Sequence, residues 1–452
     1  MANTGGSQLH LPDNLSYECI RCGRSCGEFW EIPVSAEKAE EIRARPVAAL
    51  AAARDPNNPV VESPWTPGRH VMRMTDGTCT LNTRAGLCAL HAAFGETAKP
   101  NICRSFPFRF LETPRGDYVG LSFACTAVLN RLGPAVADQG DALRDLQRWT
   151  FSRHRIEEPP GLTNLIPLSW EQYEAIERDL ADLLDPALGP IDVRLVAQAA
   201  YMQLLVRFLR EAREQTGQMT AESEAQDKLL PAFRRRMRGE AGEPWAIPLR
   251  LARRRGASPL LRRMFLGFAH ALRNTYGERR GRLRSYVMVM NTYFRHAAGR
   301  GAVQLPTLPA ATDWRRLREI RFDPRRPELD ELLTRYFRHR LFRKDLLQAE
   351  TLHFGHCLQL MHWGLIHWYS ACFANVAGAA EVDYEHLTEG LRNVEKYYVY
   401  HSTFDRLFAT YPLLRNFLDW IFIHPLYAYS MGYTEERAVG ATPSPPPLSG
   451  GG

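Results

Sequence analysis

The sequence predicts a mainly α-helical fold, in which a small, irregular, metal-stabilised Cys-rich domain with short strands precedes an all-α helical domain. Two observations lead to this prediction. Seven of the nine cysteines lie in the first 125 residues of the 452-residue chain. From about residue 131 the chain instead shows apolar residues at helical spacing, with capping signals between segments. We therefore expect a cysteine-cluster domain over 1–130, a helical domain over 131–430 and a disordered Pro/Gly/Ser tail over 431–452.

The regular elements of the first domain are predicted to be short. Residues 36–45 have the pattern of a short helix, and residues 71–74 and 118–123 have the pattern of short strands. The stretch 53–68 contains four prolines and is expected to be a loop. The cysteine clusters fall between these elements, as expected where metal binding drives local folding.

The second domain is predicted to be an irregular bundle of helices. Ser169-x-x-Gln172 matches a capping box, which predicts a helix to about Leu184. A second helix is expected from Asp192, just after Pro190, to about Glu214. The remaining helices are predicted to begin at Ser258-Pro259 and Pro327-Glu328, and to cover 284–298, 348–376, 384–401 and 404–423.

The spacing of the cysteines indicates metal binding. Pairs separated by two residues, each with a nearby glycine for the turn, allow both donor atoms to reach one ion. Seven thiols and one imidazole make eight candidate ligands, enough for two tetrahedral zinc sites, whereas one [4Fe–4S] cluster needs four thiolates. The candidate metal ligands are Cys19, Cys22, Cys26, Cys79, Cys88, His91, Cys103 and Cys125.

Disulfide bonds are the main alternative. The chain opens with no basic or apolar leader segment, so we expect a cytoplasmic, reducing location. An odd number of clustered cysteines also fits a disulfide framework poorly. Among metals, the spacing matches neither the Cys-x3-Cys-x2-Cys motif of radical enzymes nor a ferredoxin run, and it leaves zinc and iron–sulfur both open.

Residues 15–130 resemble a known family. The motifs that carry the resemblance are Cys19-Ile-Arg-Cys22-Gly-Arg-Ser-Cys26, Gly77-x-Cys79, Cys88-x2-His91, Lys99-Pro100-x2-Cys103-Arg104-x-Phe106-Pro107 and Leu121-Ser122-x2-Cys125. They resemble the YkgJ-like cysteine-cluster family of zinc- or iron-chelating domains, and the layout is closest to its flagellin lysine-N-methylase branch. The adjacent Cys-Cys of the family pattern is reduced here to Cys26 alone. The resemblance implies a bound metal and, for the methylase branch, S-adenosylmethionine as methyl donor and a flagellin-like protein substrate.

The sequence therefore leaves three functions open. The chain is a metal-binding cysteine-cluster protein, a protein lysine methylase, or a basic interaction protein whose metal is purely structural. The third rests on residues 228–284, which hold 16 basic and three acidic residues. No helix-turn-helix or RNA-binding motif accompanies this patch, so nucleic acid is not the favoured partner. The sequence also lacks Rossmann, P-loop, serine-hydrolase and zinc-protease motifs, and no catalytic residue is assigned.

A histidine-rich segment in the second domain is a further candidate. On a helix, His353, His356, Cys357 and His367 share one face and His362 lies opposite. These side chains are either an inward-facing ligand or proton-transfer set or hydrogen-bonded core histidines, and we favour the core interpretation. The same segment is too polar to cross a membrane, because Gln359, His362 and His367 interrupt its apolar run.

Overall fold

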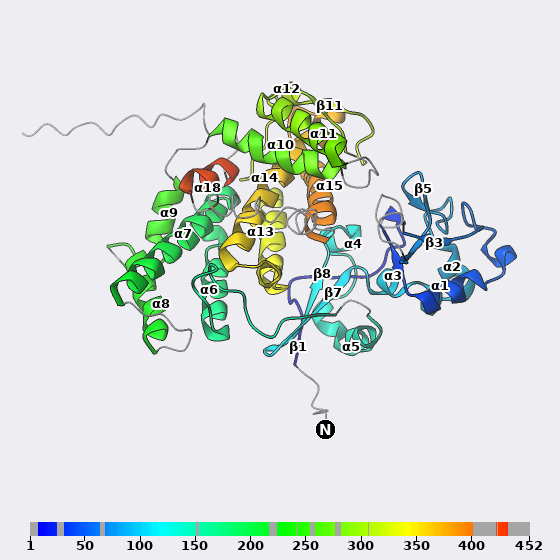
Figure 1. Ribbon diagram of the computed structural model, residues 1–452, viewed down its shortest axis with the longest axis horizontal. Coiled ribbons are helices and arrows are strands. Elements are labelled where there is room, and N and C mark those ends of the chain that lie inside the picture. Colours follow the sequence, from blue (N-terminus) through cyan, green and yellow to red (C-terminus); the bar gives the residue numbers. More distant parts are fainter. Residues whose placement is uncertain are drawn as a thin grey trace, which may run out of the picture.

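The fold was analysed in a computed structural model, which describes residues 8–24, 31–63, 68–150, 153–216, 224–240, 242–253, 258–275, 282–305, 307–400, 422 and 424–432. Within these residues the protein is mainly α-helical, with short strands concentrated in its first third (Figure 1). The first part of the prediction, a mainly α fold, is thus confirmed. Stabilisation of the cysteine-rich part by metal stays a prediction.

A small module forms one end of the molecule (Figure 1). Its helices and turns are α1 (Ala36–Arg43), η2 (Val47–Leu50), α2 (Ala89–Phe94), η3 (Glu96–Ala98) and α3 (Asn101–Ser105). Its strands are β2 (Pro33–Val34), β3 (Val60–Glu62), β4 (His70–Met72), β5 (Met74–Thr75) and β6 (Thr78–Cys79). The first three strands form one antiparallel sheet in the order β2-β4-β3, and β5 pairs with β6. These elements enclose a small apolar core of their own.

A four-stranded sheet connects this module to the helices. Its order is β1-β8-β7-β9, in which β7 and β8 form an antiparallel hairpin and the two outer strands run parallel to their neighbours. The strands are β1 (Leu9–His10), β7 (Phe108–Thr113), β8 (Gly116–Leu121) and β9 (Arg153–Arg155). The inner residues of the hairpin belong to the same apolar core as the long helices. The larger core therefore crosses residue 130, where the sequence predicts a domain boundary.

The helical body completes the fold. Its helices are α4 (Thr126–Leu129), α5 (Gly140–Trp149), α6 (Trp170–Asp182), α7 (Ile191–Thr216), α8 (Glu224–Met237), α9 (Ala246–Arg253), α10 (Pro259–Thr275), α11 (Arg282–Ala297), α12 (Trp314–Leu317), α13 (Pro327–Phe342), α14 (Leu352–Val376), α15 (Tyr384–Val394) and α18 (Pro425–Gly432). Short 3-10 turns lie at η4 (Val136–Gln139), η5 (Pro186–Leu188) and η6 (Asp345–Gln348), and a small hairpin joins β10 (Ala302–Val303) to β11 (Thr312–Asp313). A π-helical turn, η7 (Glu395–Tyr400), continues α15.

Local capping signals explain most of the helix starts. The predicted capping box is present at Ser169, whose hydroxyl accepts from the backbone N–H of Gln172. Pro327 occupies the first turn of α13, and Thr351 caps α14, which therefore begins four residues later than predicted. The predicted helix at 384–401 divides into α15 and the π-helical turn. Most of the predicted helix at 404–423 lies outside the described residues.

The predictions in the first domain are close to the observed elements. The helix at 36–45 corresponds to α1, where the Ser35 hydroxyl accepts from the Lys38 N–H. The strand at 71–74 divides between β4 and β5, and the strand at 118–123 corresponds to β8. In contrast, α8 and α9 lie in the basic segment without having been individually predicted.

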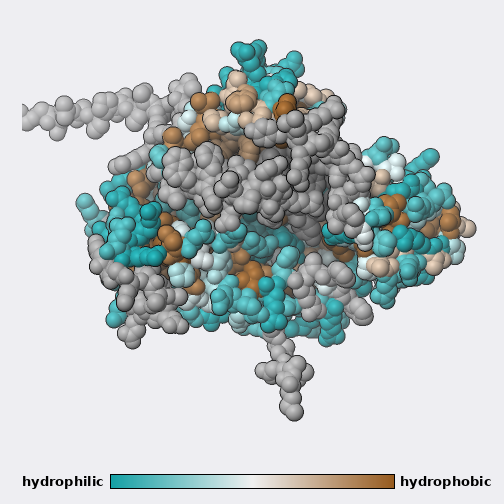
Figure 2. All heavy atoms as spheres, viewed as in Figure 1, coloured by the Kyte–Doolittle hydropathy of each residue, from teal (hydrophilic) through white to brown (hydrophobic). Residues whose placement is uncertain are grey.

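None of the helices that the structure describes is both long and apolar enough to cross a membrane. Among the residues that Figure 2 colours, hydrophilic ones cover most of the area, with hydrophobic residues in smaller areas between them.

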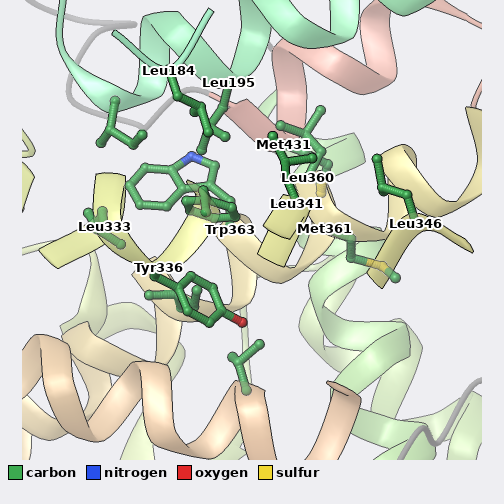
Figure 3. Close-up of a cluster of buried hydrophobic side chains, with 14 of the residues drawn as sticks. Leu184, Leu195, Leu333, Tyr336, Leu341, Leu346, Leu360, Met361, Trp363 and Met431 are labelled. Atoms are coloured by element: carbon green, nitrogen blue, oxygen red, sulfur yellow. The ribbon is translucent and has the colours of Figure 1, made fainter. Parts of the chain in front are cut away.

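Trp363 occupies the centre of the larger core. It lies on α14 and is fully buried, among the leucines of α7 and α13 and beside Met431 of α18 (Figure 3). Its indole N–H donates to the carbonyl oxygen of Gly432 at 2.9 Å, so the polar atom of the ring is also satisfied. One side chain thus connects helices that are distant in sequence.

Replacing Trp363 is expected to destabilise the whole helical body. Trp363→Ala should lower the free energy of unfolding by about 3–5 kcal/mol, because a large cavity would remain. Trp363→Phe keeps most of the volume but leaves the Gly432 carbonyl without this donor, and should cost less. Urea unfolding measures both, and equal losses for the two variants would contradict the assignment of Trp363 as a packing centre.

Candidate functional site

The first cysteine loop lies on the surface beside the turn that follows α4. The backbone N–H groups of Tyr17 and Glu18 donate to the carbonyl oxygens of Pro134 and Leu132 at 3.1 and 2.8 Å. Cys19 and Cys22 follow directly and are both exposed. Their thiols are therefore accessible to a metal ion from solvent.

Two glycines bring the first loop against the second. Gly23 and Gly86 both have positive φ angles, of 66° and 80°. A Cβ atom added to Gly23 would lie 2.1 Å from the carbonyl oxygen of Gly86, so no larger residue fits there without movement. This contact places the backbone next to Cys22 against the loop that leads into Cys88.

Cys125 lies beside the thiols of the first loop. It precedes the first residue of α4 and is only 8% exposed. Burial raises the pKa of its thiol to about 11, and the neighbouring Cys22 and Cys19 act in the same direction. The structure therefore brings Cys125 close enough to Cys19 and Cys22, about a hundred residues earlier in the sequence, for their charges to interact.

The other predicted ligands belong to the small module. Cys79 is buried in β6, while Cys88 and Cys103 are partly buried and pack against the same small core. His91 lies on α2 and is exposed, yet the neighbouring protein atoms remove part of the water around its ring. This partial desolvation, together with the charge of Lys99, lowers the pKa of His91. Cys26 lies outside the described residues.

Tyr17 is a site residue that the sequence analysis missed. Burial raises the pKa of its hydroxyl, and the neighbouring thiols Cys19 and Cys125 raise it further. Its ring packs edge-on against Phe108 at the start of β7, with the ring centroids 5.1 Å apart. Its position just before Cys19 is the one sequence signal that could have indicated it.

The donor chemistry of these residues fits a thiophilic metal. Thiolate sulfur is the preferred ligand of zinc and of iron–sulfur clusters, and the thiols of Cys19, Cys22 and Cys125 are close enough for their charges to interact. Among the residues that the structure describes, no three histidine, cysteine, aspartate or glutamate side chains have the geometry of a formed metal site. The full eight-ligand set thus stays a prediction.

The segment that carries Cys125 is held by three arginines from the helical body. Arg343 donates to the carbonyl oxygen of Leu121 at 2.9 Å, Arg392 to that of Ala124 at 3.1 Å, and Arg335 to that of Leu129 at 3.0 Å. All three side chains are buried. Guanidinium groups present several donors in a fixed plane and suit such carbonyl contacts.

A buried ionic cluster, which we call the Arg343 network, lies behind this segment. Arg343 donates to both oxygens of Asp345 at 2.7 and 2.8 Å and to Glu395 at 2.5 Å. Arg340 also bonds Asp345, and the Tyr336 hydroxyl donates to Glu395 at 3.0 Å. Burial alone would raise the pKa of Asp345, but Arg343 and Arg340 outweigh it and hold that pKa below its ordinary value.

Three histidines of α14 are buried, namely His353, His356 and His362, whereas His367 is half-buried. Nδ1 of His362 lies 2.8 Å from an Arg340 nitrogen, and Nδ1 of His367 lies 2.8 Å from an Arg262 nitrogen. His353 Nε2 lies 3.9 Å from the Cys357 sulfur. These contacts agree with the core interpretation favoured from the sequence.

The basic segment 228–284 is in part internal. Arg234 bonds Asp179 and the carbonyl of Ala175, and Arg262 donates to the carbonyl of Met431. Arg254 and Arg255, the last two residues of the run Arg253–Arg255, lie outside the described residues. At least two of these arginines therefore serve the fold.

An open cleft of about 1030 Å³ lies between α6, the α8–α9 connection and α13. Arginines and aspartates line it together, including Arg178, Arg238, Arg338, Asp182 and Asp185, and Trp245 forms part of its wall. The charges are mixed, and none of the lining residues is a cysteine. The cleft is thus separate from the thiol site.

The comparisons with known proteins add no relative: no protein-family model, no curated protein and no solved structure matches the chain.

The buried histidines predict a loss of stability in mild acid. Burial lowers the pKa of His353 to about 4 and that of His356 to about 3, from an ordinary value of 6.5. The unfolded chain therefore takes up protons first as the pH falls below 6.5, and the stability of the folded state declines from there. Between pH 6.5 and 5 each such histidine should cost about 2 kcal/mol.

Urea unfolding at about pH 7.5, 6 and 5 measures this slope, and His356→Gln should flatten it by one histidine's share. An unchanged slope in His356→Gln would show that His356 is already able to take up a proton in the folded protein.

Proposed function

We propose that this chain is a metal-binding cysteine-cluster protein, which holds an iron–sulfur cluster or Zn(II) with the thiols of its N-terminal loops. The observation that carries the proposal is the Gly23–Gly86 contact, which brings the Cys22 loop against the Cys88 loop, together with Cys125 lying near enough to Cys19 and Cys22 for their charges to interact. Protein lysine methylation stays an expectation from the family resemblance alone, because no contact among the described residues favours it.

The surroundings of these thiols support metal binding over a purely structural role. A buried structural cysteine behaves as a small apolar residue, as Cys372 does near the C-terminal end of α14. Cys19 and Cys22 are instead exposed on a loop, where they contribute little to packing. Cys22 also lies in a tight turn, because its two neighbours, Arg21 and Gly23, both adopt positive φ angles. Such a turn is typical of thiolate ligands of a metal.

Elemental analysis and the visible spectrum of the purified protein identify the bound metal. Protein purified anaerobically should be analysed for iron, zinc and acid-labile sulfide, and its visible spectrum recorded. Iron with sulfide and a brown colour identifies an iron–sulfur protein, whereas a colourless protein with zinc identifies a zinc site. Protein that retains neither metal after anaerobic purification and reconstitution would overturn the proposal.

Loss of one loop thiol is expected to release the metal. Cys22→Ser and Cys125→Ser should each weaken metal affinity by more than about 100-fold, since even residues that only orient a ligand contribute 10–100-fold. Cys372→Ala is the matched control, because Cys372 is buried in α14 away from the loops. Metal content per chain, measured after equal dialysis, distinguishes the variants. Full retention by Cys22→Ser would show that Cys22 is not a ligand.

A further inference from the structure

The first loop is tied to a helix from the far end of the chain. Arg24, two residues after Cys22, donates to Oε1 of Glu389 on α15 at 2.7 Å. The two residues are 365 positions apart in the sequence. The side chain of Arg24 is 47% exposed and that of Glu389 is 20% exposed, so this surface ion pair is partly shielded from solvent.

The Glu389 carboxylate also contacts Arg392, which binds the backbone next to Cys125. Arg392 donates from one nitrogen to both oxygens of Glu389, at 3.3 and 3.2 Å. Its Nε donates to the carbonyl oxygen of Ala124, the residue before Cys125. Glu389 and Arg392 therefore bridge the loop of Cys22 and the segment of Cys125.

The helix that carries this bridge is itself held firmly. A Cβ atom on Gly390 would lie 2.2 Å from the Ser370 hydroxyl, so α15 packs directly on α14. The Asn393 side chain donates to the backbone carbonyl of Glu389 and accepts from Thr307. The π-helical turn that follows begins with Glu395, which is fixed by the Arg343 network.

We propose that Glu389 and Arg392 of α15 form a positioning clamp that holds the Cys22 loop against Cys125. This inference rests on the proposed function for its metal readout. Neither residue is a metal ligand: the pair acts through Arg24 on one side and the Ala124 carbonyl on the other. The clamp fixes the distance between the Cys22 loop and Cys125. The rate at which bound metal is released therefore depends on residues in the last third of the chain.

A matched ion pair lies close by on the chain. Glu381 is also a carboxylate between two arginines, Arg321 and Arg326, at 3.5 and 3.6 Å. It lies just before α15, but its partners belong to the helical body and not to a cysteine loop. Glu381→Gln therefore removes an equivalent charge without touching the clamp.

The first test measures metal release from the loaded protein. Glu389→Gln should speed the transfer of metal to excess chelator by about fivefold, the scale expected of a partly exposed ion pair. Glu381→Gln should release metal at the wild-type rate. Equal rates for the wild type and both variants would overturn the clamp.

The second test needs no metal. In reduced, metal-free protein, alkylation of Cys125 is compared with that of exposed Cys19 by mass spectrometry. Cys125 is 8% exposed, so reagent reaches it only through local opening, which we expect to increase when the Cys22 loop is released. Glu389→Gln and Arg24→Gln should each raise the alkylation rate of Cys125 by about fivefold. Their effects should not add in the double variant, because both variants break the same Arg24–Glu389 contact.

Additive effects, or unchanged rates in both single variants, would overturn the clamp. Arg24→Gln changes a half-exposed side chain and keeps the test open should Glu389→Gln fold poorly. If the wild type holds no metal, the proposed function fails, and the alkylation rates still decide whether the clamp exists.

Discussion

The position of Arg343 is the constraint on which the rest of the molecule depends. Its guanidinium is buried and bonds the end of β8, the turn at Asp345 and the first residue of the π-helical turn. Gly120 makes this possible, since a Cβ atom there would lie 2.5 Å from the Arg343 Cβ. Removing one partner of such a buried ion pair is costly because it leaves a charge unpaired. The sheet and the helices are thus held to one relative position.

Arginine has a consistent use in this structure. The chain carries a net charge of +7 and only five lysines among its 57 basic residues, so nearly all of its positive charge is on arginine. Several of these arginines donate to backbone carbonyls inside the protein, as Arg335, Arg392 and Arg194 do. A planar group with five donors satisfies carbonyls at a helix end in a way that lysine does not. Composition alone therefore overstates the charge available to a partner.

Local signals predicted the local structure well. Ser169 with Gln172, Pro327 and the proline before Asp192 each indicated a helix start within a few residues, because capping is decided by neighbours in sequence. The same reasoning could not find the contact between Arg24 and Glu389, or the core that joins β8 to α13, since both connect distant segments. The spacing of the cysteines predicts metal chemistry, which stays a prediction. Only the fold shows that Cys125 lies close enough to Cys19 and Cys22 for their charges to interact, whereas Cys103 packs against the small core.

The arginine contacts to the Cys125 segment also set an order of events during synthesis. The donors at positions 335, 343 and 392 leave the ribosome more than two hundred residues after the carbonyls that they bind. The nascent N-terminal loops therefore lack the full set of these contacts until residue 392 has left the ribosome. Thiols positioned through such late contacts reach their final arrangement only then, so the proposed metal site would be completed late in synthesis.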